Sequence, residues 1–288
     1  MQRLFKLLIL LFFVIGGSTW MYFQNAALYL SGFAYLLAIL TLLWLVSLAL
    51  KDASIIDIFW GTGFILLAAF YTMLSQQPMQ ARAFLCVVLV GIWGARLSFY
   101  LWKRNWGKGE DYRYQVFRAE GGKHFWWISY FRVFILQGWL TWVVAAPVGY
   151  LLLMAPPTPL HWGDAVIVVV WLVGFVFETW GDWQLTQFKA NPANRGKVLN
   201  TGFWRLTRHP NYFGDAVQWW ALYALAWQAG GGWYFFSPLL MTFLLMEVSG
   251  VVLLEKSLVT NKPQYANYIA ETPAFFPYKI KLWFPQKK

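Results

Sequence analysis

The sequence predicts an all-α membrane protein, a polytopic bundle of seven or eight transmembrane helices with both termini in the cytoplasm. Of its 288 residues, 59% are hydrophobic and only 12% are charged, whereas roughly a quarter are charged in a soluble domain. The mean hydropathy is +0.48, and the apolar residues gather in runs of about 20, the length that crosses a bilayer. The basic residues behind the net charge of +11 lie in short loops between these runs, so we expect no nucleic-acid partner.

Eight stretches have the length and composition of a span. They are 4–22, 27–50, 54–75, 82–102, 126–154, 163–188, 213–229 and 234–256. The first follows Arg3 and Lys6, as the core of a cleaved signal peptide would, but no small-residue cleavage site closes it. We therefore expect residues 1–26 to be retained as an additional N-terminal transmembrane segment.

The distribution of lysine and arginine predicts the orientation. These residues concentrate in 103–125, in 189–212 and from 256 onward, whereas the connections 155–162 and 230–233 contain none. Under the positive-inside rule the three basic segments are cytoplasmic, and eight spans place both termini there as well. The polar chemistry is then on one side of the membrane. The single cysteine, Cys86, lies in an apolar run and excludes an intrachain disulfide.

The sixth apolar stretch ends in the polar sequence "ETWGDWQLTQFKANPANRG". Glu178 and Asp182 are four residues apart, so a helix places both carboxylates on one face. Carboxylates inside a span are costly to bury and usually face a cavity or a partner. Two interpretations stay open: a helix-end pair neutralised by Lys189 or Arg195, and a polar pocket that opens toward the cytoplasm.

A second polar stretch, "TGFWRLTRHPNYFGD", separates two strongly apolar segments. Pro210 fixes a turn, and Asn211 or Asp215 could cap the helix that follows. A cap explains only one polar residue, whereas two arginines at a helix N-terminus favour an anion site. The candidate binding residues here are Arg205, Arg208, His209, Asn211, Tyr212 and Asp215.

Other polar residues lie in the first half of the chain. Asp57 falls within an apolar run, and it is either a residue of a helix start near the surface or an acid that faces a substrate. The loop that contains Asn105 and Lys108 is either solvated charge or a segment that closes over a cofactor. None of the three histidines has a histidine or cysteine at i+3 or i+4, so we expect no metal site.

These motifs resemble a known superfamily. "RHPNYFGD", "TGFWRLT" and "DWQLTQFKANP" resemble the C-terminal half of the integral-membrane steroid 5α-reductases and sterol C14-reductases. "SIIDIFWGTGF", "WGARLSFYLWKRNWGKGEDYRY" and "LLEKSLVTNKPQYANYIAETPAFFPY" resemble its bacterial DUF1295 branch. The resemblance covers about residues 50–280. It implies a single membrane domain over 27–288 in a bacterial inner membrane, with a cofactor-binding half at about 163–280.

The resemblance also implies a cytoplasm-facing NADPH site. Asp182 matches an aspartate on the reductases' cofactor helix, and Asn211 with Asp215 matches a run expected near the nicotinamide amide or ribose. No GxGxxG follows a strand, which argues against a Rossmann site. The expected cofactor-binding residues are Asn105, Lys108, Glu178, Asp182, Lys189, Asn191, Arg195, Arg205, Arg208, His209, Asn211, Tyr212, Asp215 and Glu255.

The implied reaction is reduction of a carbon–carbon double bond, conjugated to a carbonyl, in a lipophilic steroid-like or isoprenoid substrate. We expect a monomeric oxidoreductase surrounded by membrane lipids, in which Asp57 and Tyr100 hold the carbonyl oxygen. The family's Gln-Glu pair is missing from the helix of Asp57, and Tyr100 is out of register, which puts a steroid substrate in doubt. The alternatives are a methyltransferase that uses S-adenosylmethionine on a lipid or isoprenylcysteine, and a non-enzymatic membrane protein such as a transporter.

Overall fold

A computed structural model describes the backbone of residues 2–76, 78–248, 251, 255, 258–259, 262 and 264–279; side chains in 2–15 and 17–26 fall outside the description. This described part is helical and contains no strand, which confirms the all-α fold class. The chain divides into two compact units. The N-terminal unit is Ile9–Leu160 with Leu225–Ser237, and the C-terminal unit is His161–Ala224 with Met1–Leu8 and Pro238–Lys288.

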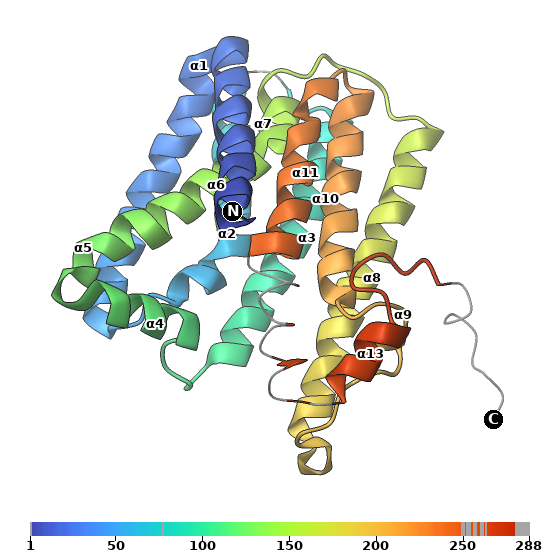
Figure 1. Cartoon of the computed structure of the whole chain (residues 1–288). Coiled ribbons are helices and arrows are strands. Elements are labelled where there is room, and N and C mark those ends of the chain that lie inside the picture. The colour runs from blue at the N-terminus through green and yellow to red at the C-terminus, as the bar shows by residue number, and fades with distance from the viewer. Residues whose placement is uncertain are drawn as a thin grey trace. The chain divides into compact units, whose positions relative to one another are not determined.

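The N-terminal unit is built on long helices and one interrupted run (Figure 1). Their bounds are α1 (Gln2–Leu50), α2 (Ile55–Leu74), α3 (Ala81–Asn105), α4 (Tyr112–Gly121), η1 (Gly122–His124), α5 (Phe125–Ser129), η2 (Tyr130–Ile135), α6 (Leu136–Val144), α7 (Ala146–Leu153) and η4 (Gly232–Phe235). The first two predicted spans, 4–22 and 27–50, both fall within α1, so the predicted break between them is helical.

Small residues let α2 and α3 approach closely. A Cβ at Gly61 would lie 2.3 Å from the carbonyl oxygen of Gly94, and a Cβ at Gly94 would lie 2.6 Å from that of Gly61. Beside this contact, the hydroxyls of Thr62 and Ser98 are 3.0 Å apart. Close backbone contact of this kind is how helices pack where the lipid supplies no hydrophobic driving force.

The predicted span 126–154 is interrupted. The helical run Tyr112–Val144 and α7 are bent by 53° at the intervening residue, Ala145. Pro147 lies in the first turn of α7, where a helix tolerates proline because that N–H needs no intrahelical partner. In addition, α4 occupies part of the predicted loop 103–125 and contacts the start of α2 through the side chains of Arg113 and Tyr114.

The C-terminal unit contains α8 (Trp162–Ala190), η3 (Pro192–Asn194), α9 (Phe203–Leu206), α10 (Pro210–Gln228), α11 (Phe236–Phe243), η5 (Leu244–Val248) and α13 (Tyr265–Glu271). On α8 the buried residues recur every three or four positions, at Ile167, Trp171 and Gly174. The exposed residues between them are apolar, among them Val166 and Val173. A helix with a packed stripe and an exposed valine face suits a lipid environment.

Four described helices are long and apolar enough to cross a membrane: Ala27–Leu50, Ile55–Leu74, Ala81–Asn105 and Trp162–Ala190. The number rises to five if the bent pair is one span. These helices indicate a membrane protein. The count of seven or eight spans and the cytoplasmic placement of the termini stay predictions.

Candidate functional site

The residues predicted to be functional fall into separate clusters in the two units. In the C-terminal unit, one cluster joins α8 to α10, and we call it the helix-pair cluster: Glu178, Asp182, Asn211, Asp215 and Gln218. In the N-terminal unit, a second cluster joins α2 to α4, and we call it the α2–α4 network: Asp57, Glu110, Asp111, Arg113 and Tyr114. Each cluster is held together by contacts between its own helices.

Glycines bring α8 and α10 into backbone contact. A Cβ at Gly214 would lie 2.3 Å from the carbonyl oxygen of Gly174 and 2.5 Å from the amide nitrogen of Glu178. A Cβ at Gly181, two turns along α8 from Gly174, would lie 3.2 Å from the amide nitrogen of Asn211. The spacing of seven residues puts Gly174 and Gly181 on one face of α8. This spacing is a sequence signal for the close contact with α10, and the sequence analysis did not use it.

This close approach pairs acids on α8 with amides on α10. Asn211 Nδ2 donates to Asp182 Oδ1 at 3.0 Å, and Gln218 Nε2 donates to Glu178 Oε2 at 2.7 Å. Glu178, Asp182 and Asp215 are each at most 6% exposed. The structure thus brings together three predicted carboxylates and Asn211, and it adds Gln218, which the sequence reading did not select.

The buried acceptors of the helix-pair cluster include two side-chain amide oxygens. Oδ1 of Asn211 and Oε1 of Gln218 are shielded from solvent and have no hydrogen-bond partner among the described residues. Buried polar atoms in folded proteins almost always have a partner. These two oxygens are therefore suited to accept hydrogen bonds from a hydroxyl or an amide of a bound molecule.

Arg208 faces away from this cluster, toward the C-terminal segment. Its Nε and Nη2 donate to the two carboxylate oxygens of Glu255, at 2.7 and 3.1 Å. Its Nη1 donates to the carbonyl oxygens of Ile269, at 3.2 Å, and of Thr272. A guanidinium with this bidentate carboxylate and these carbonyls acts as a clamp on the segment, and Arg208 is only 7% exposed. The phosphate contact predicted for Arg208 stays a prediction. In the structure, the guanidinium N–H groups of Arg208 donate to Glu255 and to backbone carbonyls.

His209 belongs to the same clamp. Its Nε2 lies 3.1 Å from Glu255 Oε1, and its ring stacks on Tyr212 with centroids 5.6 Å apart. Burial lowers the pKa of His209 below its usual range, although the hydrogen bond and the charge of Glu255 act in the opposite direction. His209, Tyr212 and Glu255 were predicted to bind a cofactor, and the structure shows them in contact with one another.

The predicted cations of the C-terminal unit lie at the surface beyond α8. Lys189 is in the last turn of α8 and is exposed, as are Asn191 and Arg195 around the short helix η3. Asn191 caps η3 by accepting from the Ala193 amide at 3.0 Å. Arg205, on α9, is half-buried. Lys189, Asn191 and Arg195 lie at or just beyond the C-terminal end of α8, the helix that carries Glu178 and Asp182. This placement suits a polar ligand that extends from these carboxylates to the surface.

Asp57 is tied to α4 rather than to Tyr100. Its two carboxylate oxygens accept from the hydroxyl of Tyr114 at 2.5 Å and from Nη2 of Arg113 at 2.6 Å. The Tyr114 hydroxyl also accepts from Gln137 Nε2 at 3.0 Å. Tyr100 lies along α3 with the guanidinium of Arg96 5.8 Å from its ring centroid.

The contact of Arg113 and Tyr114 with Asp57 was not predicted, because both lie more than 50 residues from it in the sequence. Nothing tests the role predicted for Tyr100.

The loop between α3 and α4 holds the remaining predicted residues. Asn105 accepts from Arg104 Nε at 3.1 Å, and Lys108 is exposed between two glycines of positive φ, Gly107 and Gly109. After the loop, Glu110 accepts from Arg118 and from the Ala53 amide at 2.8 Å each. Partial burial alone would raise the pKa of Glu110, but these hydrogen bonds outweigh it and lower the pKa.

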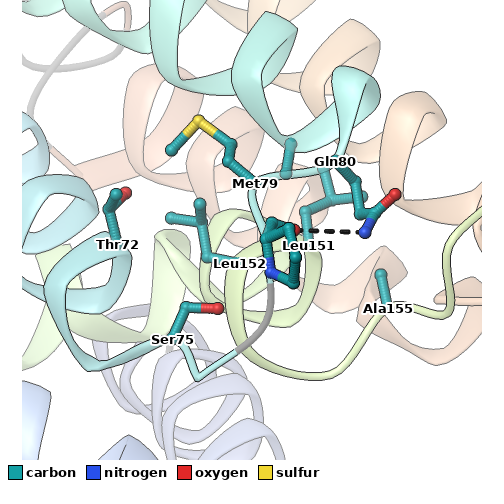
Figure 2. Close-up of a pocket in the computed structure, with 9 residues that line it drawn as sticks. Thr72, Ser75, Met79, Gln80, Leu151, Leu152 and Ala155 are labelled. Atoms are coloured by element: carbon teal, nitrogen blue, oxygen red, sulfur yellow. Dashed lines mark hydrogen bonds between the residues drawn. The ribbon is translucent and has the colours of Figure 1, made fainter.

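A small pocket of about 80 Å³ lies elsewhere in the N-terminal unit, between the end of α2, the segment before α3, and α7 (Figure 2). Thr72, Ser75 and Gln80 give it a polar side, and Leu152 an apolar one. The Gln80 side chain donates to the carbonyl oxygen of Pro78 at 3.1 Å, as drawn there. No residue predicted to bind cofactor or substrate lines this pocket.

Comparison with known proteins identifies the family of this chain. Residues 43–272 match the model of a family described as a protein of unknown function, DUF1295, so the chain belongs to the DUF1295 family. It is 27% identical over 265 residues to an uncharacterized protein of Schizosaccharomyces pombe, a match that covers 82% of this chain and 75% of the relative. No solved structure matches the chain.

Proposed function

We propose that this protein is an NADPH-dependent membrane reductase that saturates a carbon–carbon double bond conjugated to a carbonyl in a lipophilic substrate. The observation that carries the proposal is the Asp182–Asn211 pair, which the glycine contact of α8 and α10 holds in place, with a free acceptor on Asn211. The resemblance of these helices to the cofactor-binding half of the sterol and steroid reductases supports the same reading.

The chemistry of the donor and acceptor set fits the two ends of this cofactor. Asp182 and Asn211 would hold ribose hydroxyls or the carboxamide, which need carboxylate and amide partners. Lys189, Arg195 and Arg205 would bind the phosphates, since fixed cations are needed there. Bound NADPH would supply a hydride to the substrate. Arg208 would then serve the site indirectly, by fixing the chain where α10 begins.

Within the N-terminal unit, the residue predicted to hold the substrate carbonyl is Asp57 of the α2–α4 network. Both oxygens of Asp57 are engaged, so the group able to donate to a carbonyl oxygen is the hydroxyl of Tyr114, turned from Asp57 toward the substrate. Such a hydrogen bond would stabilise the enolate charge that develops during reduction. Under this proposal Tyr114→Phe and Asp57→Asn slow turnover and leave NADPH affinity near normal. An unchanged rate in both variants would remove this network from the reaction.

A binding experiment tests the cofactor assignment directly. Full-length protein in detergent is titrated with NADPH while its melting temperature is recorded, for the wild type, N211A and N200A. Asn200 is an exposed loop asparagine in the same unit, so N200A is the matched control for the same chemical change. We expect NADPH to raise the melting temperature of the wild type and N200A but not of N211A. A shift of equal size in N211A would exclude the Asp182–Asn211 pair as part of the site.

One observation favours the alternative, a methyltransferase that uses S-adenosylmethionine. The engagement of Arg208 by Glu255 leaves fewer cations for phosphates, while buried carboxylates would suit the ribose hydroxyls of either cofactor. The same titration therefore includes S-adenosylmethionine. Stabilisation by that cofactor and none by NADPH would overturn the reductase proposal, and lipid extracts would then show added methyl groups rather than a gain of two hydrogens.

A further inference from the structure

The segment Trp102–Arg132 of the N-terminal unit combines exposed aromatic rings with exposed cations. Trp106 is 71% exposed and Trp126 is 55% exposed, although both are large apolar side chains. Tryptophan at such positions typically lies at the headgroup level of a bilayer. Glycines of positive φ at 107 and 109 turn the chain between α3 and α4, and α4 leads from there to α5 (Figure 1). The exposed surface comprises Trp102, Lys103, Arg104, Trp106, Lys108, Lys123, Trp126 and Trp127, and we call it the interfacial surface.

The three acids of this segment each form an ion pair with an arginine of the same segment. Glu110 pairs with Arg118 at 2.8 Å, and Asp111 pairs with Arg113 at 2.9 Å. Glu120 is held by Arg132 at 3.1 Å. No other acid occurs between residues 102 and 132.

The arginines that pair with these acids also cover aromatic rings. The Arg118 guanidinium lies 4.4 Å from the ring centroid of Phe125, and that of Arg132 lies 4.3 Å from Phe117. The charges of Arg118 and Arg132 are therefore offset within the segment by an acid and a ring, although both side chains stay partly exposed.

The lysines of the segment face outward. Lys103, Lys108 and Lys123 are exposed and make no ion pair with any described residue. Lysine carries a compact charge on a flexible stem, which suits contact with a mobile phosphate. Adjacent tryptophans and uncompensated lysines are the pattern that recognises an anionic membrane surface.

We propose that the interfacial surface binds the headgroups of anionic phospholipids in the leaflet that it touches. The tryptophans fix the depth of the surface at the headgroup level, and the lysines bind lipid phosphates. Each lysine near an anionic bilayer strengthens association about fivefold. Apart from Lys108, which is also an expected cofactor-binding residue, the residues of this surface have no part in the proposed reductase activity.

The test compares K103Q/K123Q with K103R/K123R, which keeps the charge at the same positions. Lys108 is left unchanged because it belongs to the proposed cofactor set. Full-length protein is reconstituted in phosphatidylcholine with and without phosphatidylglycerol, and native mass spectrometry counts the phosphatidylglycerol that stays bound. We expect the wild type and K103R/K123R to retain it and K103Q/K123Q to bind it roughly 25-fold more weakly, about fivefold for each charge.

Three outcomes would overturn the proposal. In the first, K103Q/K123Q retains as much phosphatidylglycerol as the wild type. In the second, both double variants lose it equally although both fold, so that charge is not the cause. In the third, inorganic phosphate alone raises the melting temperature as much as phosphatidylglycerol does, which would make a soluble anion the ligand. Melting temperatures in phosphatidylcholine show that both variants are folded.

Discussion

Replacing Gly214 by alanine tests the helix contact on which the helix-pair cluster depends. The new Cβ would lie 2.3 Å from the carbonyl oxygen of Gly174, whereas an ordinary contact begins at 3.4 Å. Because the obstructing atoms are backbone, the helices must separate by about 1.1 Å, the difference between these distances. That movement would break the 3.0 Å bond between Asn211 and Asp182.

The free-energy cost follows from these contacts. Overpacking costs roughly 1–3 kcal/mol, and each lost hydrogen bond to a carboxylate costs about 1.5–3 kcal/mol. Alanine returns about 1 kcal/mol through its higher helix propensity. The expected net loss is about 3 kcal/mol. In chains of 150–250 residues each kcal/mol corresponds to roughly 2–4 °C of melting temperature, so the decrease should be several degrees.

The assay is thermal unfolding in detergent, with Gly91→Ala as the matched control. Gly91 is also in a helix, α3, but a Cβ there would meet nothing within 4 Å. We expect G91A to melt at or slightly above the wild-type temperature and G174A, where the nearest contact is 2.7 Å, to fall between G91A and G214A. A G214A protein as stable as G91A would refute the close contact of α8 and α10.

The other predictions concern ion pairs and pH. Arg208→Ala leaves Glu255 without its bidentate partner and should lower stability by about 2–3 kcal/mol, with partial recovery in Arg208→Lys, measured by chemical denaturation. Because burial lowers the pKa of His209, the folded state binds fewer protons than the unfolded one below pH ~6.5. Stability should thus be full above that pH and decline as the pH falls, and melting curves of His209→Gln should lack this step. Glu110→Gln weakens the bonds to Arg118 and to the Ala53 amide and should cost about 1 kcal/mol, with faster hydrogen exchange in α4; unchanged exchange would contradict the anchoring role.

The elements that the sequence predicts well are the long apolar ones. The predicted span 54–75 corresponds to α2, 82–102 lies inside α3, and 163–188 lies inside α8, because uninterrupted hydrophobic length is a local property. The run 126–154 contains a 53° bend that apolar composition alone does not reveal, and Pro147 was the local signal for it. The helix α4 was not predicted because its sequence is polar. It contains two arginines and one glutamate, a composition that is typical of a loop between spans.

Pairing across the chain is what the sequence could not supply. Asp57 and Tyr114 are 57 residues apart, and Arg208 and Glu255 are 47 apart. Sequence reasoning selected three of these four residues as candidate site residues but could not tell which acid meets which donor. Counting the basic residues therefore overestimates the number of cations that are available to bind a phosphate. The sequence does not distinguish an exposed loop arginine from an arginine, such as Arg208, that is paired with an acid.

The run Thr207–Asp215 divides at Pro210 into two parts with different partners. Before the proline, the Thr207 hydroxyl donates to the Ala274 carbonyl at 3.1 Å, and the Arg208 amide donates to the Pro273 carbonyl at 2.9 Å. After it, Asn211 and Gly214 face α8. Substitutions before Pro210 should therefore act through stability, whereas Asn211→Ala after it should remove the proposed ligand contact. A binding defect in an Arg208 variant carries information about the site only if the variant is compared with the wild type at equal folded fraction.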